Sequence, residues 1–141
     1  MDEEGMKFTF HHIGLACRSL APEIKTHERL GYTREGSTFH DPIQKINGIF
    51  MVHGPMRIEL IEPSGEHSPV HNILEKGIKM YHQCFSVHDL AQAISAMESD
   101  GARLIAGPAP AVAFGGRNIA FLMLRTMLIV ELVESAKKAS P

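Results

Sequence analysis

The sequence predicts an α+β fold in which two tandem βαβββ modules form a shared, strongly curved mixed sheet around a central metal site. Three observations predict it. The chain contains an internal repeat at an offset of 70 to 72 residues, each copy shows the pattern strand, helix and three strands, and both copies carry a histidine and a glutamate at matching places. The repeat bears on the fold because a single repeat unit does not bury its apolar face alone, so the copies are expected to pack together.

The repeat extends over most of the chain. The segment 58–62 (IELIE) matches 130–134 (VELVE) at an offset of 72, and small loop insertions would explain the drift from 70. We therefore divide the chain into a first module at 8–62, a connector at 63–79 and a second module at 80–134. The pairs aligned at an offset of 70 are His12 with His82, Leu20 with Leu90, Ala21 with Ala91, Ile24 with Ile94 and Gly31 with Gly101.

The first module begins with a β-rich apolar run at 8–17, which predicts a strand. Ser19 is a typical helix N-cap residue, Ile24 and His27 follow at helical spacing, and Gly31 ends the helix. We interpret His27 as a structural residue on the buried face of that helix. Three further strands are predicted at 32–35, 46–53 and 57–62, with Gly54-Pro55 as a hairpin turn.

The second module repeats this order. The run 80–87 predicts a strand, Asp89 caps the next helix, Ile94 and Met97 lie on its apolar stripe, and Gly101 ends it. In the connector, Ser68-Pro69 opens a short helix that ends before Gly77. The last strands are predicted at 103–106, 117–124 and 127–134, with a turn at Arg125-Thr126.

Composition excludes several classes of partner. The chain has 141 residues, 14 lysines and arginines against 16 aspartates and glutamates, and a formal charge of -2. This balance gives no attraction to nucleic acid or to an anionic membrane surface. The acidic start at 1–5 lacks the features of a secretory signal, so we expect a cytoplasmic protein with Cys17 and Cys84 as reduced core residues. A chain of this length buries a sizeable core without a metal, so any metal would serve chemistry.

Two glutamates lie within apolar strands. Glu59 is flanked by Ile58 and Leu60, and Glu131 occupies the same place in the second copy. Burying an unpaired carboxylate costs several kcal/mol, so each of these carboxylates requires a partner. The repeat would bring both carboxylates to a pseudo-twofold axis together with the two histidines that begin the modules. The sequence therefore predicts a metal site with these ligands: His12, Glu59, His82 and Glu131.

The other polar residues receive simpler interpretations. Glu62 and Glu134 also repeat, but each lies three residues after a predicted ligand, so strand alternation places it on the opposite face, in solvent. Gly116 and Arg117 lie in a loop that is a candidate for substrate contact, because glycine allows close backbone approach and arginine suits a carboxylate or phosphate. A turn with a surface arginine explains that loop equally well. The histidines interpreted as surface or loop residues are His11, His40, His53, His67, His71 and His88.

Several of these segments resemble the vicinal oxygen chelate superfamily, which includes glyoxalases, bleomycin resistance proteins and dioxygenases. The segments 12–16 (HIGLA), 58–63 (IELIEP) and 129–134 (IVELVE) resemble the superfamily's ligand-bearing strands. The connector segments 68–70 (SPV) and 74–77 (LEKG) are similar to those of the methylmalonyl-CoA epimerase-like branch, as are 81–82 and 85–89. The resemblance implies one domain of this superfamily over 1–141 and assigns the metal to the four ligands that the repeat selects.

The resemblance implies a metal-dependent epimerase or isomerase that removes an α-proton from an acyl-CoA or other thioester through a metal-stabilised enolate. We expect Glu131 to be the base, with Glu59 as second choice, and a divalent Co, Ni, Mn or Zn ion as cofactor. We also expect a homodimer. Two alternatives stay open: a glyoxalase I-like lactoylglutathione lyase with the same ligands, and a metal-free small-molecule binding protein of the resistance type.

Two departures from the branch concern the substrate pocket. Some of its epimerases carry a further glutamate where this chain has 47–49 (NGI), so that base is missing here. The loop between the last two strands is also reduced to a tight turn at 124–127. Both differences predict a reshaped substrate pocket.

Overall fold

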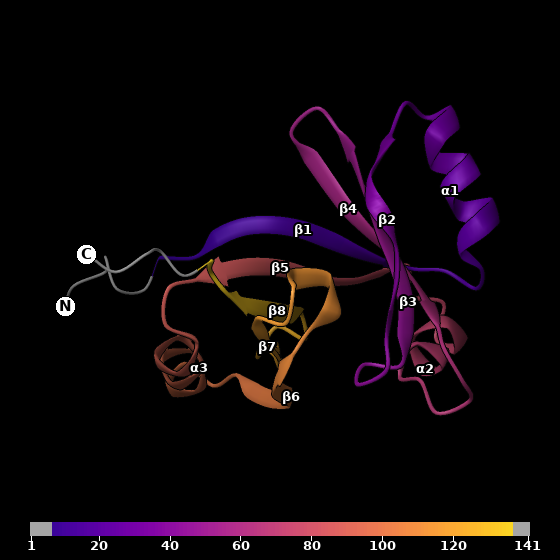
Figure 1. The fold of residues 1–141 in the computed structure, drawn as a ribbon. Coiled ribbons are helices and arrows are strands. Elements are labelled where there is room, and N and C mark those ends of the chain that lie inside the picture. The colour runs from indigo at the N-terminus through magenta and orange to yellow at the C-terminus, as the bar shows by residue number, and fades with distance from the viewer. Residues whose placement is uncertain (1–6, 137–141) are drawn as a thin grey trace. The chain divides into compact units, whose positions relative to one another are not determined.

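A computed structural model describes residues 7–136 (Figure 1). These residues divide into two compact units. The first, called the N-terminal unit below, comprises His12–His82, and the second, called the C-terminal unit, comprises residues 7–11 together with 83–136. Because this division falls inside two strands, the predicted module boundaries at 8–62, 63–79 and 80–134 stay a prediction.

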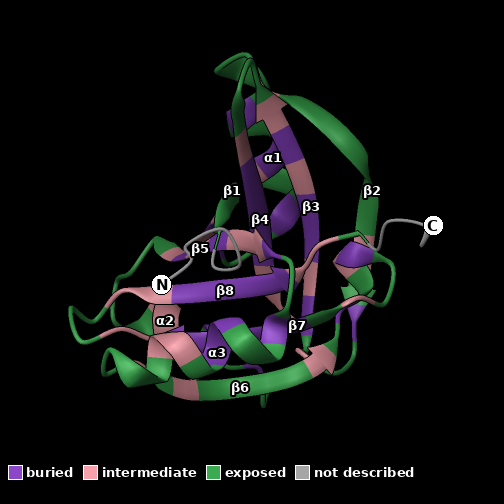
Figure 2. Ribbon diagram, turned by 90° about the vertical axis from the view of Figure 1, so that its left-hand side faces the viewer, coloured by how far each residue is buried: buried purple, intermediate pink, exposed green. Residues whose placement is uncertain are grey.

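The N-terminal unit contains a four-stranded sheet in the order β2-β3-β4-β1. Strands β1 and β4 are parallel, and the other neighbours are antiparallel. Leu20 and Ile24 of the first helix pack on Ile49, Met51 and Leu60 of the sheet. Figure 2 shows β4 buried over its middle, where the candidate site lies. The elements are β1 (Thr9–Ala16), α1 (Leu20–Arg29), β2 (Thr33–Asp41), β3 (Ile46–His53), β4 (Met56–Pro63) and α2 (Val70–Glu75).

The C-terminal unit has the strand order β5-β8-β7-β6, which is equivalent to the order β1-β4-β3-β2 of the N-terminal unit. Strands β5 and β8 are parallel, and Leu90 and Ile94 of α3 pack on Leu122 and Leu132. The predicted α+β class with two βαβββ repeats is therefore confirmed. The elements are β5 (Met80–Val87), α3 (Leu90–Ser99), β6 (Arg103–Pro110), the 3-10 helix Val112–Phe114, β7 (Asn118–Met123) and β8 (Ile129–Glu134).

The edge strands differ most from the prediction. Strand β2 continues to Asp41 and β6 to Pro110, several residues beyond the predicted ends. Both strands are exposed along most of their length, so no apolar alternation marks them in the sequence. The predicted bounds of β3 and β5 agree with the structure. No helix of residues 7–136 is long and apolar enough to cross a membrane.

The N-termini of the two main helices are capped in different ways. Asp89 accepts a hydrogen bond from the Gln92 amide at 3.0 Å, as predicted for α3. Ser19 makes no such bond at α1. Instead, Glu62 at the end of β4 accepts from the Leu20 amide at 2.7 Å and from Asn47 Nδ2 at 2.9 Å. The prediction that Glu62 lies in solvent is therefore wrong, because its carboxylate stabilises the positive end of the helix dipole.

Replacing Glu62 with alanine is expected to lower the free energy of unfolding by about 1–2 kcal/mol, the usual cost of losing a helix cap. Ser19→Ala is the matched control, since the Ser19 side chain makes no cap bond and its loss should cost less than about 0.5 kcal/mol. Urea unfolding followed by circular dichroism measures both. Equal losses in the two variants would contradict the assignment of the cap to Glu62.

Candidate metal centre

Three strands position three buried polar side chains in the N-terminal unit. His12 lies on β1, Glu59 on β4 and His82 at the start of β5. The parallel register pairs Gly14 with Glu59, and strand alternation places His12 on the same face as Gly14. The three side chains are almost inaccessible, with exposures of 0% for His12, 4% for Glu59 and 1% for His82. Three of the four predicted ligands are therefore brought together.

Single atoms of these side chains converge. His12 Nε2 lies 3.0 Å from Glu59 Oε1 and 3.2 Å from His82 Nε2. His82 Nε2 lies 3.6 Å from the same Glu59 oxygen. Two imidazole nitrogens and a carboxylate oxygen thus point to one small volume inside the sheet.

This spacing fits a metal ion. Ligands bound to one ion at about 2.0–2.2 Å, with right or tetrahedral angles between them, lie about 2.8–3.6 Å apart. The three observed distances agree with this range. Imidazole and carboxylate are also the donor types that Zn, Co, Ni and Mn accept. The residues present therefore fit a divalent cation.

Gly14 makes room for the His82 imidazole. A Cβ atom on residue 14 would lie 2.7 Å from both Nδ1 and Nε2 of that ring, closer than side-chain atoms approach. The sequence shows only a glycine in a strand, which often marks such close approach without naming the partner. Gly14 is thus a residue of the site that the sequence did not assign.

Replacing Gly14 with alanine is expected to displace the His82 ring and to lower the affinity for a divalent ion by about 10–100-fold, as for other residues that orient metal ligands. Isothermal titration with Co²⁺ or Zn²⁺ measures the affinity. Gly36→Ala is the control: a Cβ there meets nothing within 4 Å, and although φ of +83° makes this substitution cost stability, Gly36 lies in β2 away from the cluster, so the affinity for the ion should be unchanged. Unchanged affinity in Gly14→Ala would show that His82 does not bind the ion.

Glu131 lies in the C-terminal unit and is described within it. The residue is 2% exposed, on β8 between Val130 and Leu132. The register of β5 and β8 pairs Cys84 with Glu131, just as β1 and β4 pair Gly14 with Glu59. The two glutamates therefore occupy equivalent places in their units. The role of Glu131 as fourth ligand stays a prediction.

The loop predicted to contact substrate is closed by its own hydrogen bonds. The Gly116 amide donates to Ala111 O at 2.9 Å, and Arg117 Nη1 donates to Glu134 O at 2.9 Å. The Arg117 guanidinium also lies 5.5 Å from the Phe114 ring centroid. Contact of Gly116 and Arg117 with substrate stays a prediction, since these bonds fix the loop without assigning it a ligand.

Two histidines outside the cluster have structural contacts. His27 is buried in α1, with Nδ1 3.0 Å from Glu23 O, as its structural interpretation requires. His11 is half-buried in β1, and its ring packs edge-on against Phe114 at 5.1 Å. His11 is therefore a half-buried strand residue and not a loop residue.

Both cysteines are buried, and neither forms a disulfide. Burial, and then the nearby Glu23 carboxylate, raises the pKa of Cys17 to about 11. The Cys17 thiol therefore stays protonated at neutral pH and is a poor nucleophile. This agrees with the core role predicted for it.

The chain thus combines two βαβββ repeats with a buried cluster of two histidines and one glutamate on its strands. Residues 11–121 match the family model described as the Glyoxalase/Bleomycin resistance protein/Dioxygenase superfamily. The chain belongs to this superfamily. The predicted resemblance is therefore confirmed.

Several proteins are similar to this chain over most of its length. An ethylmalonyl-CoA/methylmalonyl-CoA epimerase of Cereibacter sphaeroides is 26% identical over 114 residues, which cover 79% of this chain and 85% of that protein. The uncharacterised protein YqjC of Bacillus subtilis is 32% identical over 129 residues, with 87% and 89% covered. The crystal structure of methylmalonyl-CoA epimerase from Mycobacterium tuberculosis has a TM-score of 0.77 at 24% identity, with 92% and 89% covered. This last likeness shows a common fold.

A liganded structure is also similar. A variant of the Streptomyces coelicolor methylmalonyl-CoA epimerase, in complex with 2-nitronate-propionyl-CoA, has a TM-score of 0.77 at 23% identity. The match covers 96% of this chain and 100% of that one. In that structure the epimerase variant therefore binds an acyl-CoA compound.

Proposed function

We propose that this protein is a metal-dependent isomerase that moves the proton on the carbon next to the carbonyl of an acyl-CoA thioester. The observation that carries the proposal is the convergence of His12, Glu59 and His82 on one small volume. The epimerases among the relatives support the reaction, because their names give methylmalonyl-CoA or ethylmalonyl-CoA as substrate.

In this proposal His12, Glu59 and His82 hold a divalent ion, and Glu131 is the fourth ligand. The equivalence of Glu131 with Glu59 in the strand register supports that role. Two carboxylates balance the charge of the ion, and four protein ligands leave a position for substrate only at five- or six-coordination. When bound, the ion would withdraw electron density from the thioester carbonyl and make the neighbouring carbon more acidic. The candidate ions are Co, Ni, Mn and a five- or six-coordinate Zn.

The protein's own groups then perform the proton transfer. If Nε2 of His12 and of His82 held the ion, the lone pair of each atom would be used for that bond, so neither histidine would serve as the base. A carboxylate of the ligand set would accept the α-proton from one face of the carbon. Epimerisation then requires that a proton from a second acid or from water add to the opposite face of the enolate. Glu131 is the first choice, because Glu59 Oε1 is already held between two imidazoles. Arg117 is proposed to contact an anionic group of the substrate.

A lactoylglutathione lyase-like reaction is the second candidate. It would use the same ligands and also begins with removal of a proton next to a carbonyl. Gly48 weakens the epimerase assignment, because some of the epimerases that the chain resembles carry a further glutamate there and this chain lacks that base.

Elemental analysis of the purified protein, combined with deuterium exchange at the α-carbon, tests the proposal. The panel contains several acyl-CoA thioesters and thiol adducts of 2-oxoaldehydes. We expect about one divalent ion per chain and exchange on an acyl-CoA. Exchange only on the thiol adducts would establish the second candidate. A protein with neither metal nor exchange would overturn both and favour a binding role.

A further inference from the structure

One side of the metal centre is aromatic. Phe50 on β3 pairs directly opposite Glu59 across the β3–β4 ladder, so the two side chains share a face. The Phe50 ring lies 5.1 Å from the His12 ring at an interplanar angle of 72°. Phe39 on β2 continues this surface, with its ring centroid 6.1 Å from that of Phe50. Both phenylalanines are half-buried, so part of each side chain remains accessible to solvent.

Phe39 also fills the space over Gly48. These two residues pair across the β2–β3 ladder, and Gly48 is buried. A Cβ atom on residue 48 would lie 2.7 Å from Phe39 Cζ and 3.1 Å from Leu60 O. Strand alternation places Gly48 on the same face as Phe50. The ring of Phe39 therefore occupies the volume that a side chain of residue 48 would take.

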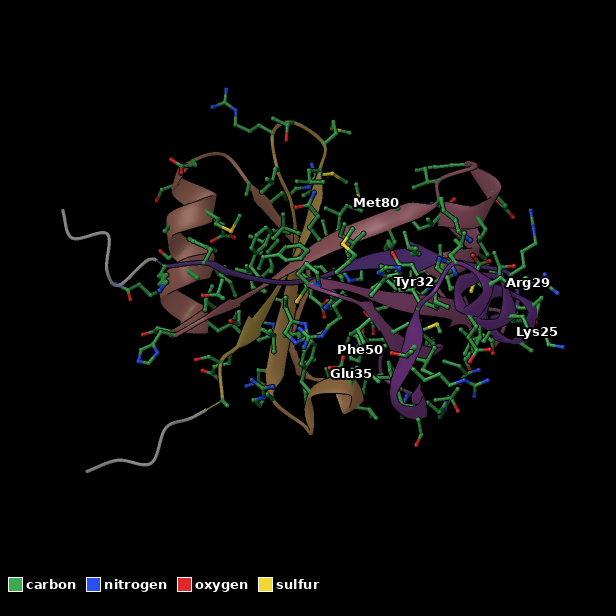
Figure 3. The ribbon with its side chains drawn as sticks, turned by 90° about the horizontal axis from the view of Figure 1, so that it is seen from above. Lys25, Arg29, Tyr32, Glu35, Phe50 and Met80 are labelled. Carbon is green, nitrogen blue, oxygen red and sulfur yellow. The ribbon has the colours of Figure 1, made fainter. Side chains whose placement is uncertain are left out.

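The nearest charged pair on this face is already satisfied. Glu35 pairs opposite Phe50 in the β2–β3 register, and Figure 3 shows these two residues close together. Arg57 Nε donates to Glu35 Oε1 at 2.9 Å, and Arg57 Nη2 donates to Glu35 Oε2 at 3.3 Å. Both groups are partly exposed to solvent. The surface next to His12 and Glu59 on the β3 side is therefore formed by apolar side chains. A substrate carboxylate that packed against this surface would lose its hydration without gaining a hydrogen-bond partner.

We propose that Phe39 and Phe50 receive the alkyl substituent on the α-carbon of a 2-alkyl acyl-CoA, and that the Phe39 ring limits the length of that substituent. The inference rests on the proposed function. It adds the orientation of the substrate: the alkyl group packs on β2 and β3, and the polar groups of the α-carbon point away from this surface. One methylene in such a hydrophobic pocket changes kcat/KM by about 10–200-fold.

The test compares 2-methyl-, 2-ethyl- and 2-propylmalonyl-CoA by deuterium exchange at the α-carbon. Phe39→Ala opens space, so the ratio of kcat/KM for the propyl to the methyl substrate should rise at least about 10-fold. Phe39→Leu, which keeps the strand apolar, should give a smaller rise and covers the case in which the alanine variant does not fold. Gly48→Ala, which takes space, should lower the same ratio.

Thr38→Ala is the matched control, since Thr38 is the exposed neighbour of Phe39 on β2 and should leave the ratio unchanged. Metal content should equal that of the wild type in every variant. If the wild type shows exchange but both Phe39 variants keep its substrate ratio, the inference is overturned while the proposed function stands. If the wild type holds no metal and shows no exchange on any of the three substrates, the proposed function fails, and the inference with it.

Discussion

Replacing Glu131 with glutamine is expected to leave most of the bound metal in place and to abolish most of the α-proton exchange. Glutamine keeps the size of the side chain and an oxygen donor, but its amide does not accept the proton from carbon. Removal of a general base typically costs on the order of 10²–10⁴-fold in rate. Deuterium exchange into an acyl-CoA, normalised to the metal content of each preparation, measures the effect.

Glu59→Gln is the comparison variant, because it shows which of the two glutamates is the base. Glu59 Oε1 lies 3.0 Å from His12 Nε2 and 3.6 Å from His82 Nε2, so its oxygen is held within the cluster. A carboxylate fixed in this way is suited to binding the ion and less suited to moving toward carbon. We therefore expect a milder loss in Glu59→Gln. The reverse ranking would assign the base to Glu59, and equal activity of both variants would show that neither glutamate moves the proton.

The internal repeat is the reason that the sequence predicted so much of the fold and site. Matching apolar strands indicated the βαβββ order, which both units have. A glutamate inside an apolar strand, such as Glu59, is costly unless it has a partner, and the repeat identified two histidines as partners. The structure brings His12, Glu59 and His82 together as predicted.

Other contacts could not be predicted because they join residues far apart in the chain without a periodic signal. The packing of the His82 ring against Gly14 and the cap that Glu62 provides to α1 are of this kind. The full length of β2 was missed for a different reason. Its exposed polar residues lack the alternation that marks a half-buried strand.

Replacing His82 with alanine is expected to remove the metal while the fold persists. The two apolar clusters that pack α1 and α3 on their sheets do not include His82, so the source of most of the stability is unchanged. Loss of one of the ligands removes a bond to the ion and leaves the other donors too few to compete with water. Metal content should fall to background, and the far-ultraviolet circular dichroism should match that of the wild type.

His27→Ala provides the matched control, because His27 is a buried histidine of the same unit that lies in α1 and not in the cluster. That variant should lose stability and keep its metal, whereas His82→Ala should lose its metal and, with it, the stabilisation that a bound ion gives to the folded state. Treatment of the wild type with a chelator should lower its melting temperature toward that of His82→Ala and leave the melting temperature of His82→Ala unchanged. Full metal content in His82→Ala would mean that the converging atoms of His12, Glu59 and His82 serve packing and do not form a metal site.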